Sequence, residues 1–466
     1  MNFESIKSKH HYYWDNVQKS IFSSSLFIKL HERIELALKS EFSIKLIEHV
    51  KLTMSSRINQ QILNFALIPV VLGACVINFN LIFLMFIPPF SFFGFFFISV
   101  VLINTIIIAY GIVWMIYLQF AQTEREFFLP YNYKRILKIN YLLYKTILGA
   151  FAYFPAIAEY LYMRYFVGKK MEQFIKKDIY YGSSFVENKL DIYMPDNTIG
   201  STTTNYHPVI IFFYGGGWTV GNKISQKYLG IRLSQMGYVV VIPNYTKYPK
   251  TKIDGVVSDF KRAVVWTKRS INDYGGDPNN IYLMGHSAGA HTSIFTIIRD
   301  VIYKSRNDEG KTNTELYDID PEWDLPKISG LILSAGVYDL PKHYEFETSI
   351  GFEEISSMSR IMGNTQESLV KNSPLLLIQD IANNKHININ QVKNLMPKKI
   401  LIIHGSQDLL ISMEQSVKFN HTLKDLSIKE LKLKIYQDKD HEEIIYDIMN
   451  LSNPELVADL KEFMSV

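Results

Sequence analysis

One stretch of this 466-residue chain constrains its fold more than any other, because residues 58–123 contain no Asp, Glu, Lys, Arg or His. A helix crosses a bilayer with about 20 consecutive apolar residues, so this stretch of 66 residues allows two crossings. We expect spans at residues 63–87 and 92–117, joined by a tight turn at Pro88 and Pro89. A soluble core does not require so long a charge-free run, and a cleaved signal peptide would lie nearer the N-terminus. The sequence therefore predicts a transmembrane helical hairpin.

The charges that flank this stretch indicate its orientation. Residues 1–57 hold 9 Lys and Arg against 6 Asp and Glu, and residues 124–180 hold 10 against 5. Positively charged flanks stay in the cytoplasm, so both ends of the chain are expected to face the cytosol. The basic excess lies beside the membrane, whereas residues 181–466 are net acidic. We therefore expect an anionic lipid bilayer, and no nucleic acid, as a partner.

Two further features bear on the membrane part. Residues 148–166 form a third apolar segment, but Glu159, Arg164 and several tyrosines favour an interfacial helix over a third span. Both readings stay open. Cys75 is the single cysteine, so no intramolecular disulfide can form, which agrees with a reducing compartment.

The rest of the chain alternates strand-like and helix-like segments. Turn-forming residues occupy 273–278, residues 304–327 resemble a polar surface insertion, and residues 337–394 are expected to form a cap. Continuous apolar strands separated by helices predict a parallel sheet that is covered on both faces. The expected helices are residues 223–236 and 253–270, and the expected strands are 190–194, 209–213, 238–243, 281–285, 328–334, 400–404 and 431–437.

A serine stands where one of these strands meets the following helix. Residues 285–289 read GHSAG, the G-x-S-x-G pattern in which a sharp strand-to-helix turn exposes a nucleophilic hydroxyl. The two glycines are needed because a larger side chain would collide with the adjacent strand or helix. The pentapeptide alone is weak, since a turn needs no chemistry. Its surroundings make Ser287 the candidate nucleophile.

A glycine-rich loop follows the apolar strand at residues 209–213. Gly215, Gly216 and Gly217 precede Trp218, so backbone N–H groups can point into a cavity and stabilise an oxyanion. We assign this role to Gly216 and Gly217, together with the N–H of Ala288. A phosphate-binding loop would continue with Gly-Lys-Ser/Thr. Gly215 and Trp218 are candidate substrate-binding residues.

A serine hydroxyl needs a base, and the base needs a carboxylate that orients it. Asp408 follows the strand at 400–404, and His441 follows the strand at 431–437, in the order serine, acid, histidine. We therefore predict Asp408 as the acid and His441 as the base. The weighed alternatives are His404, which precedes the acid, and the acids next to the histidine, Asp438 and Asp440.

Two other histidines lie near the serine. His286 is expected to line the substrate pocket or to pack, and His291 to have a structural role. His441 is followed by two glutamates but lacks the second histidine, four residues on, that a zinc-binding helix needs. Neither a metal nor a cofactor is therefore expected.

These motifs resemble the α/β-hydrolase superfamily, and more narrowly the isoprenylcysteine α-carbonyl methylesterases. The resemblance covers residues 179–463 and rests on segments 213–218, 243–245, 275–291 and 404–408. It implies the roles already given to Ser287, Asp408 and His441. It also implies hydrolysis of the methyl ester of a prenylated cysteine. Many relatives carry histidine before the three glycines, where this chain has Tyr214.

The sequence thus predicts an α/β-hydrolase fold, a mostly parallel sheet flanked by helices with a cap insertion, preceded by a two-span transmembrane hairpin. Its parts are a cytosolic segment (1–57), the hairpin (58–123), a juxtamembrane helical segment (124–178) and the hydrolase domain (179–466). The expected function is a membrane-anchored serine esterase that acts on a lipidated or other ester at the surface of the endoplasmic reticulum or Golgi, facing the cytosol. A general carboxylesterase or lipase, and an inactive scaffold with this fold, remain alternatives.

Overall fold

A computed structural model describes residues 57–88, 90–120, 132–152, 168–182, 187–196, 206–306, 325–353, 355–381 and 384–464. The chain divides into two units, residues 1–146 and 147–466. The predicted cytosolic segment before residue 57 and most of both the polar insertion and the third apolar segment lie outside the described residues. The division of the chain into four parts therefore stays a prediction.

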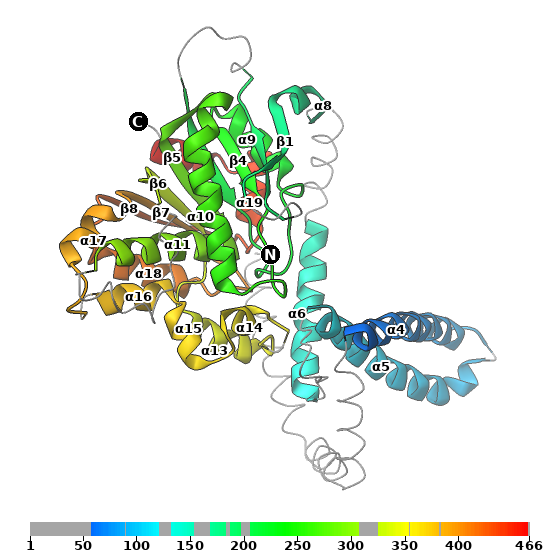
Figure 1. Cartoon of the computed structure of the whole chain (residues 1–466). Coiled ribbons are helices and arrows are strands. Elements are labelled where there is room, and N and C mark those ends of the chain that lie inside the picture. Colours follow the sequence, from blue (N-terminus) through cyan, green and yellow to red (C-terminus); the bar gives the residue numbers. More distant parts are fainter. Residues whose placement is uncertain are drawn as a thin grey trace. The chain divides into compact units, whose positions relative to one another are not determined.

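An eight-stranded sheet forms the centre of the second unit (Figure 1), in the order β1-β2-β4-β3-β5-β6-β7-β8. Neighbours from β4 to β8 run parallel, whereas β1 and β2 are antiparallel at one edge. The strands are β1 (Ile175–Tyr180), β2 (Lys189–Tyr193), β3 (His207–Phe213), β4 (Val239–Pro243), β5 (Gly276–His286), β6 (Gly330–Ser334), β7 (Lys399–Gly405) and β8 (Glu430–Tyr436).

Helices cover both faces of this sheet. Every residue of β4 and β6 is buried, which requires cover on both sides. Two groups of helices supply it, and within each group neighbouring helices contact one another. One group is α9 (Lys227–Gln235), α19 (Glu443–Asn450) and α20 (Pro454–Met464), and the other is α10 (Ile253–Ser270), α11 (Ala288–Lys304), α16 (Pro374–Ile381) and α18 (Glu414–Lys424). This arrangement is the predicted α/β-hydrolase fold.

The chain between β6 and β7 forms the predicted cap. It consists of short helices, which include α16. The others are α13 (Leu340–Ile350), α14 (Met358–Met362), α15 (Gln366–Lys371) and α17 (Ile389–Leu395). Apolar residues of α14 and α16 are buried in the same core as the sheet, so the cap is a packed part of the domain.

The structure differs from the expected elements mainly in three places. Strand β1 was not predicted, because most of its residues are exposed on this edge strand and leave no apolar pattern. Helix α9 begins at Lys227 and not at residue 223. The predicted turn at 273–278 is wrong in its second half, because β5 already begins at Gly276, which pairs with His207 before the register shifts.

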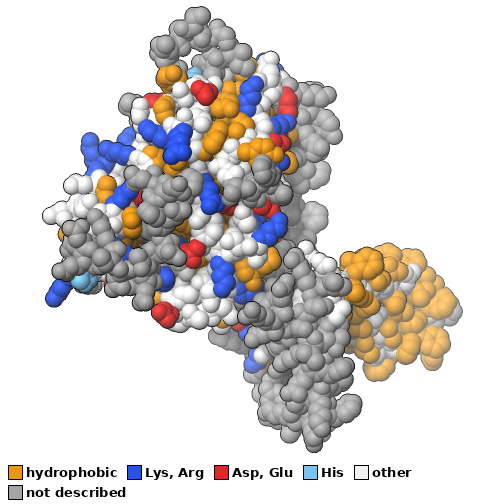
Figure 2. Space-filling view, in the orientation of Figure 1, with side chains coloured by type: hydrophobic (Ala, Val, Ile, Leu, Met, Phe, Trp, Pro, Cys, Tyr) orange, Lys and Arg blue, Asp and Glu red, His pale blue; other side chains and the backbone are white. Residues whose placement is uncertain are grey.

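Two long apolar helices form most of the described first unit. They are α4 (Arg57–Met85) and α5 (Gly94–Phe120), joined through a short 3-10 helix, η1 (Phe90–Phe93), and they pack against each other. Both are long and apolar enough to cross a membrane, and their surface is almost continuously hydrophobic (Figure 2). Asn78 donates to Thr105 across the pair at 3.3 Å, and a side chain at Gly111 would collide with Val71, so the helices approach closely.

A third helix, α6 (Tyr133–Ala152), contacts α5. The side-chain amide of Asn140 donates to the carbonyl oxygen of Ala109 at 3.0 Å, and Ile136 and Ile139 are buried. Lys134, Arg135 and Lys138 lie on the same helix, which gives it the amphipathic character of a segment at a membrane surface.

Candidate active site

Ser287 occupies a sharp turn between β5 and α11. Its backbone has φ 53° and ψ −123°, an unusual conformation for a residue with a side chain. A side chain at Gly285 would lie 2.6 Å from Cα of Ala290, and one at Gly289 would collide with the carbonyl oxygen of Phe213. The amide of Ser287 donates to the carbonyl oxygen of Ser334 at 2.9 Å. The turn therefore requires both glycines of the G-x-S-x-G pattern and is anchored to strand β6.

Asp408 and His441 are brought together by the loops that follow β7 and β8. Nδ1 of His441 lies 2.7 Å from Oδ2 of Asp408, and both side chains are buried. The two loops are also joined directly, since Gln407 N donates to Lys439 O at 2.9 Å. A side chain at Gly405 would collide with that same carbonyl, so this glycine allows the close approach. Two residues predicted from separate strands thus form a hydrogen-bonded pair.

The pair shifts the proton affinities of both groups. Burial alone would raise the pKa of Asp408, but the His441 charge and the hydrogen bonds from His404 and His441 hold it well below its ordinary value. Burial alone would lower the pKa of His441, but the charge and hydrogen bond of Asp408 raise it above 6.5. Asp408 therefore stays ionised, and His441 is a stronger base than a free imidazole.

His286 joins His441 to the nucleophile turn. Nε2 of His286 lies 2.9 Å from the backbone carbonyl oxygen of His441, and the two ring centroids are 4.8 Å apart. His286 is fully buried, and burial lowers its pKa. Since His286 directly precedes Ser287, this contact holds the base loop beside the nucleophile. The substrate-binding role predicted for His286 stays a prediction.

The glycine loop lies against the same serine. A side chain at Gly215 would be 2.7 Å from Cβ of Ser287. Gly216, Gly217 and Trp218 all have positive φ (108°, 55° and 60°), so the loop is tightly curled. Among the described residues, no hydrogen bond uses the N–H of Gly216 or Gly217. These two amides therefore stay available as oxyanion donors.

The third predicted donor is the N–H of Ala288. Ala288 is the first residue of α11, and the amides of a first helical turn have no acceptor within the helix. The positive end of the helix dipole also favours negative charge at this position. The location of Ala288 thus suits the oxyanion role predicted for it.

Side chains from two other elements hold the glycine loop. The indole N–H of Trp218 donates to Oγ1 of Thr292 on α11 at 2.9 Å. Oγ of Ser357, which precedes cap helix α14, donates to the carbonyl oxygen of Gly217 at 2.6 Å. Trp218 is buried, and its hydrogen bond to Thr292 anchors the glycine loop to α11. Its predicted contact with substrate stays a prediction.

Tyr214 helps to close the loop at its base. Its hydroxyl donates to Oδ1 of Asn244 at 3.0 Å, and the same oxygen accepts the backbone N–H of Lys223 at 2.7 Å. Asn244 therefore ties the two ends of segment 214–223 together. The hydroxyl of Tyr245 donates to the Tyr214 carbonyl at 3.1 Å and fixes the strand end. Asn244 belongs to the predicted 243–245 motif, but no signal in the sequence assigned this contact.

The rival residues make other contacts. His404 is fully buried, and its Nε2 lies 3.2 Å from Oδ2 of Asp408, the same oxygen that contacts His441. Asp438 accepts from Gln407, and Asp440 accepts the amides of Glu442 and Glu443 at 3.0 Å each, so both serve local turns. His291 bonds the carbonyl oxygen of Asn372 at 2.9 Å, which suits its expected structural role.

Comparison with a family model identifies the protein family of this chain. The model, BD-FAE, matches residues 190–423, about half of the chain. The chain belongs to the BD-FAE family. The matched segment of this BD-FAE member includes the glycine loop, Ser287 and Asp408, and it ends before His441.

Named relatives add detail. The chain is 30% identical over 312 residues to the probable isoprenylcysteine alpha-carbonyl methylesterase ICMEL1 of Arabidopsis thaliana, covering 67% of this chain and 59% of the relative. It is 28% identical over 297 residues to the isoprenylcysteine alpha-carbonyl methylesterase ICME of the same plant (64% and 62%). The chain thus spans about three fifths of the length of these two relatives. Among solved structures, esterase B from Lactobacillus rhamnosis matches with a TM-score of 0.48 and 16% identity over 66% of this chain and 96% of that one.

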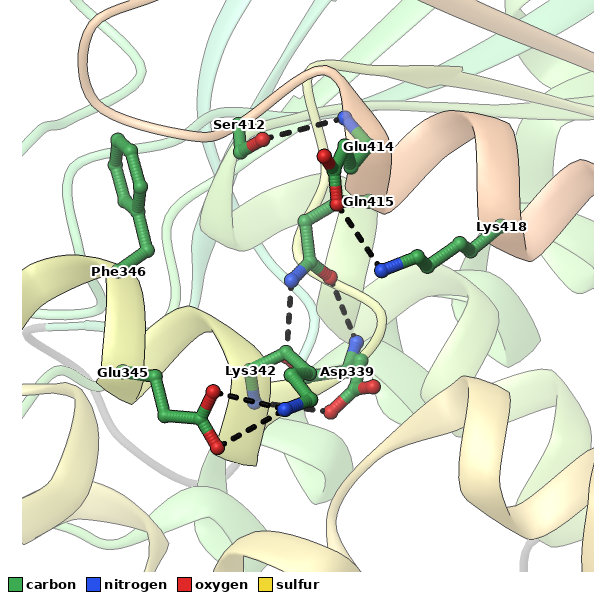
Figure 3. A pocket seen from close by; sticks show the side chains of 8 residues that line it. All are labelled: Asp339, Lys342, Glu345, Phe346, Ser412, Glu414, Gln415 and Lys418. Atoms are coloured by element: carbon green, nitrogen blue, oxygen red, sulfur yellow. Dashed lines mark hydrogen bonds and ion pairs between the residues drawn. The ribbon is translucent and has the colours of Figure 1, made fainter.

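A separate pocket of about 300 Å³ in this BD-FAE member lies between the cap and helix α18 (Figure 3). Its wall contains two ion pairs, Lys342 with Glu345 and Lys418 with Glu414. The Gln415 side chain is held by backbone groups of residues 338 and 339. None of the predicted site residues lines this pocket, and its charged groups already have partners. The pocket is therefore separate from the candidate esterase site.

Among the described residues, one group could hold a metal ion. It comprises His286, His441 and Glu442, whose candidate ligand atoms lie within 4.8 Å of one another. His286 and His441 already take part in the contacts described above. The group therefore coincides with the proposed base and is no separate centre.

Proposed function

We propose that this chain is a membrane-anchored serine hydrolase of carboxylic esters, and that its substrate is the methyl ester of a prenylated cysteine. The observation that carries the hydrolase assignment is the buried pair of Asp408 and His441, joined through His286 to the Ser287 turn. The names of the plant relatives support the methylesterase assignment.

The reaction proceeds in two acyl-transfer steps. Nε2 of His441 accepts the proton of the Ser287 hydroxyl as the oxygen attacks the ester carbonyl carbon. The amides of Gly216, Gly217 and Ala288 stabilise the oxyanion that forms. The carbon–oxygen bond to the alcohol breaks, and His441 gives its proton to the departing methoxide, which leaves as methanol. Water, deprotonated by His441, then attacks the acyl-enzyme carbonyl carbon. The bond to Ser287 breaks, and the protonated His441 returns its proton to the Ser287 oxygen as the carboxylic acid is released.

Asp408 orients the base and stabilises its charged form. Its hydrogen bond to Nδ1 fixes the tautomer in which Nε2 of neutral His441 is free to accept a proton. The raised pKa of His441 strengthens proton uptake from the serine. The carboxylate does not accept the proton itself, because its own pKa is held low.

The hairpin gives such an enzyme access to lipidated substrates. A prenylated cysteine partitions into the bilayer, so an enzyme anchored by α4 and α5 meets it at a raised local concentration. The flanking charges support a cytosolic orientation, with anionic lipids as neighbours. The endoplasmic reticulum or Golgi is the proposed location. A general membrane carboxylesterase or lipase is the second candidate, favoured by 42% identity over 116 residues to esterase LipQ of Mycobacterium tuberculosis.

A substrate panel separates the two candidates. Purified full-length chain is given farnesylcysteine methyl ester, p-nitrophenyl butyrate and tributyrin, with the Ser287→Ala variant as the control for each. A kcat/KM for the prenylcysteine ester at least about tenfold above that for the other substrates supports the methylesterase. A preference for butyrate esters or for the glyceride rejects it in favour of the general enzyme. If the chain hydrolyses none of the three substrates, the hydrolase assignment is rejected.

A further inference from the structure

A second imidazole contacts the proposed acid. His404 is the penultimate residue of strand β7 and is fully buried. Its Nε2 lies 3.2 Å from Oδ2 of Asp408 and 3.1 Å from the carbonyl oxygen of Ile411. Its Nδ1 lies 2.7 Å from the hydroxyl oxygen of Ser416, on helix α18. Oδ2 of Asp408 is thus shared between two histidines, His404 on one side and His441 on the other.

The contacts of His404 define its tautomer. Nε2 faces two oxygens that only accept hydrogen bonds, an ionised carboxylate and a backbone carbonyl, so it must carry the proton. In this tautomer Nδ1 is an acceptor, and the Ser416 hydroxyl is its donor. A serine hydroxyl can also accept, so the two acceptors at Nε2 set the tautomer. The hydrogen bond from Ser416 polarises the ring and strengthens Nε2–H as a donor to Asp408.

The other oxygen of Asp408 is already occupied. Oδ1 accepts the backbone N–H groups of Leu410 at 2.9 Å and Ile411 at 2.8 Å. These bonds fix the plane of the carboxylate, and His404 supplies the remaining donor from the protein interior. A donor to a carboxylate reduces the negative charge available to a second partner. His404 thus influences how strongly Asp408 holds the proton of His441.

We propose that His404 and Ser416 are positioning residues for the acid: Ser416 strengthens the Nε2 donor of His404 through its hydrogen bond to Nδ1, and His404 holds and partly neutralises Oδ2 of Asp408 toward His441. This inference rests on the proposed hydrolase function. Neither residue touches the reacting atoms. Their effect reaches the reaction only through the strength and direction of the bond between Asp408 and His441.

Three variants of the full-length chain test this relay. Ser416→Ala removes only a hydroxyl, and His404→Met removes the imidazole while roughly conserving volume. His404→Gln keeps an N–H donor near the position of Nε2. Ser293→Ala is the matched control, because among the described residues the buried hydroxyl of Ser293 donates to the carbonyl oxygen of Gly289 and not to Asp408, His404 or His441. For each variant, kcat/KM on p-nitrophenyl butyrate is measured from pH 5 to 9, and folding is checked by thermal unfolding.

The readout is the acid limb of the pH profile, which reports the protonation of His441. Loss of the donor in His404→Met, or its weakening in Ser416→Ala, leaves Asp408 more basic. Asp408 then holds the proton of His441 more strongly, and the pKa of His441 rises. We expect Ser416→Ala and His404→Met to move the acid limb upward by about 0.5 to 1 pH unit. The limb should stay within about 0.2 unit of the wild type in His404→Gln and Ser293→Ala. His286, Asp440 and Glu442, which also influence His441, are unchanged in every variant.

The outcomes separate this inference from the proposed function. A purely structural role would lower the amount of active enzyme but leave the acid limb where it is. An unmoved limb in folded Ser416→Ala therefore overturns the relay, even if His404→Met fails to fold. A wild-type chain that hydrolyses no ester at any pH overturns the proposed function, and with it the basis of this inference.

Discussion

Oδ2 of Asp408 lies 2.7 Å from Nδ1 of His441, and the two residues are 33 positions apart on loops after neighbouring strands. This distance is that of a charge-assisted hydrogen bond. The contact is buried, and it depends on the parallel pairing of β7 with β8, which brings both strand ends to one edge of the sheet. The chemistry proposed for the chain follows from this relationship.

Ser287→Ala should lower kcat by about 10⁴-fold or more while leaving the unfolding temperature nearly unchanged, because the small side chain fits the same turn. Ester hydrolysis by purified protein measures this effect. Ser293→Ala, in the helix α11 that follows Ser287, serves as the control and should retain wild-type activity. A Ser287→Ala enzyme with more than a tenth of wild-type kcat would show that another group is the nucleophile.

Asp408→Asn should lower kcat by roughly 10³- to 10⁴-fold, since an amide no longer selects the required His441 tautomer. Asp438→Asn is a suitable comparison, because Asp438 lies in the neighbouring loop and contacts Gln407. The comparison variant should keep at least half of the activity. Equal losses in both variants would point to general disturbance of the loops and not to a specific acid.

The rate should depend on pH through His441. Activity requires the neutral imidazole, and Asp408 raises the pKa of His441, so kcat/KM should fall on acidification with an apparent pKa above 6.5. The pKa of Asp408 is held far lower, so this carboxylate adds no second step in the assay range. In the Asp408→Asn variant, the acid limb of any residual activity should move to lower pH. An acid limb below pH 6 in the wild type would contradict this electrostatic arrangement.

Asn244→Leu should lower kcat by about 10²-fold with little change in KM, since both ends of the glycine loop lose their shared acceptor. Tyr214→Phe removes one of the two bonds and should have a smaller effect. Steady-state kinetics on a soluble aryl ester measure both variants, and Tyr274→Phe is a control outside the site. A rise in KM with unchanged kcat would assign Asn244 to substrate binding instead.

The membrane anchor is tested by extraction. Wild-type chain should remain with membranes in alkaline carbonate, whereas the double variant Leu72→Lys, Leu102→Lys should be released. Each lysine at the centre of a span costs about 2.5 to 3.5 kcal/mol, and both leucines are exposed on their helices. As a control, substitution of Lys385 and Lys393 by Leu leaves α4 and α5 unchanged and should not change extraction. Release of the wild type would refute the predicted spans.

The sequence predicted much of the fold and of the site for identifiable physical reasons. Strands β4 and β6 are buried on both faces and so appear as continuous apolar runs, and α5 and all of α4 after Arg57 lack charge. The Gly285 and Gly289 spacing reflects steric limits that hold in any such turn. The parallel arrangement then brings Asp408 and His441 to one edge.

Other features depend on contacts between distant segments and leave no local pattern. Ser357 reaches the glycine loop across 140 positions, and His286 reaches the His441 carbonyl across 155. Strand β1 has few buried residues, so its pairing with β2 could not be predicted from alternation. The shared role of Asn244 at Tyr214 and Lys223 likewise appears only when three segments meet.

The most direct test of the account is methanol release from farnesylcysteine methyl ester by membranes that contain the full-length chain or its Ser287→Ala variant. We expect wild-type membranes to release methanol in proportion to the protein present, and the variant to release none above empty membranes. No wild-type release, alongside serine-dependent hydrolysis of aryl esters, would contradict the methylesterase assignment. Equal release by wild type and variant would contradict the role of Ser287 itself.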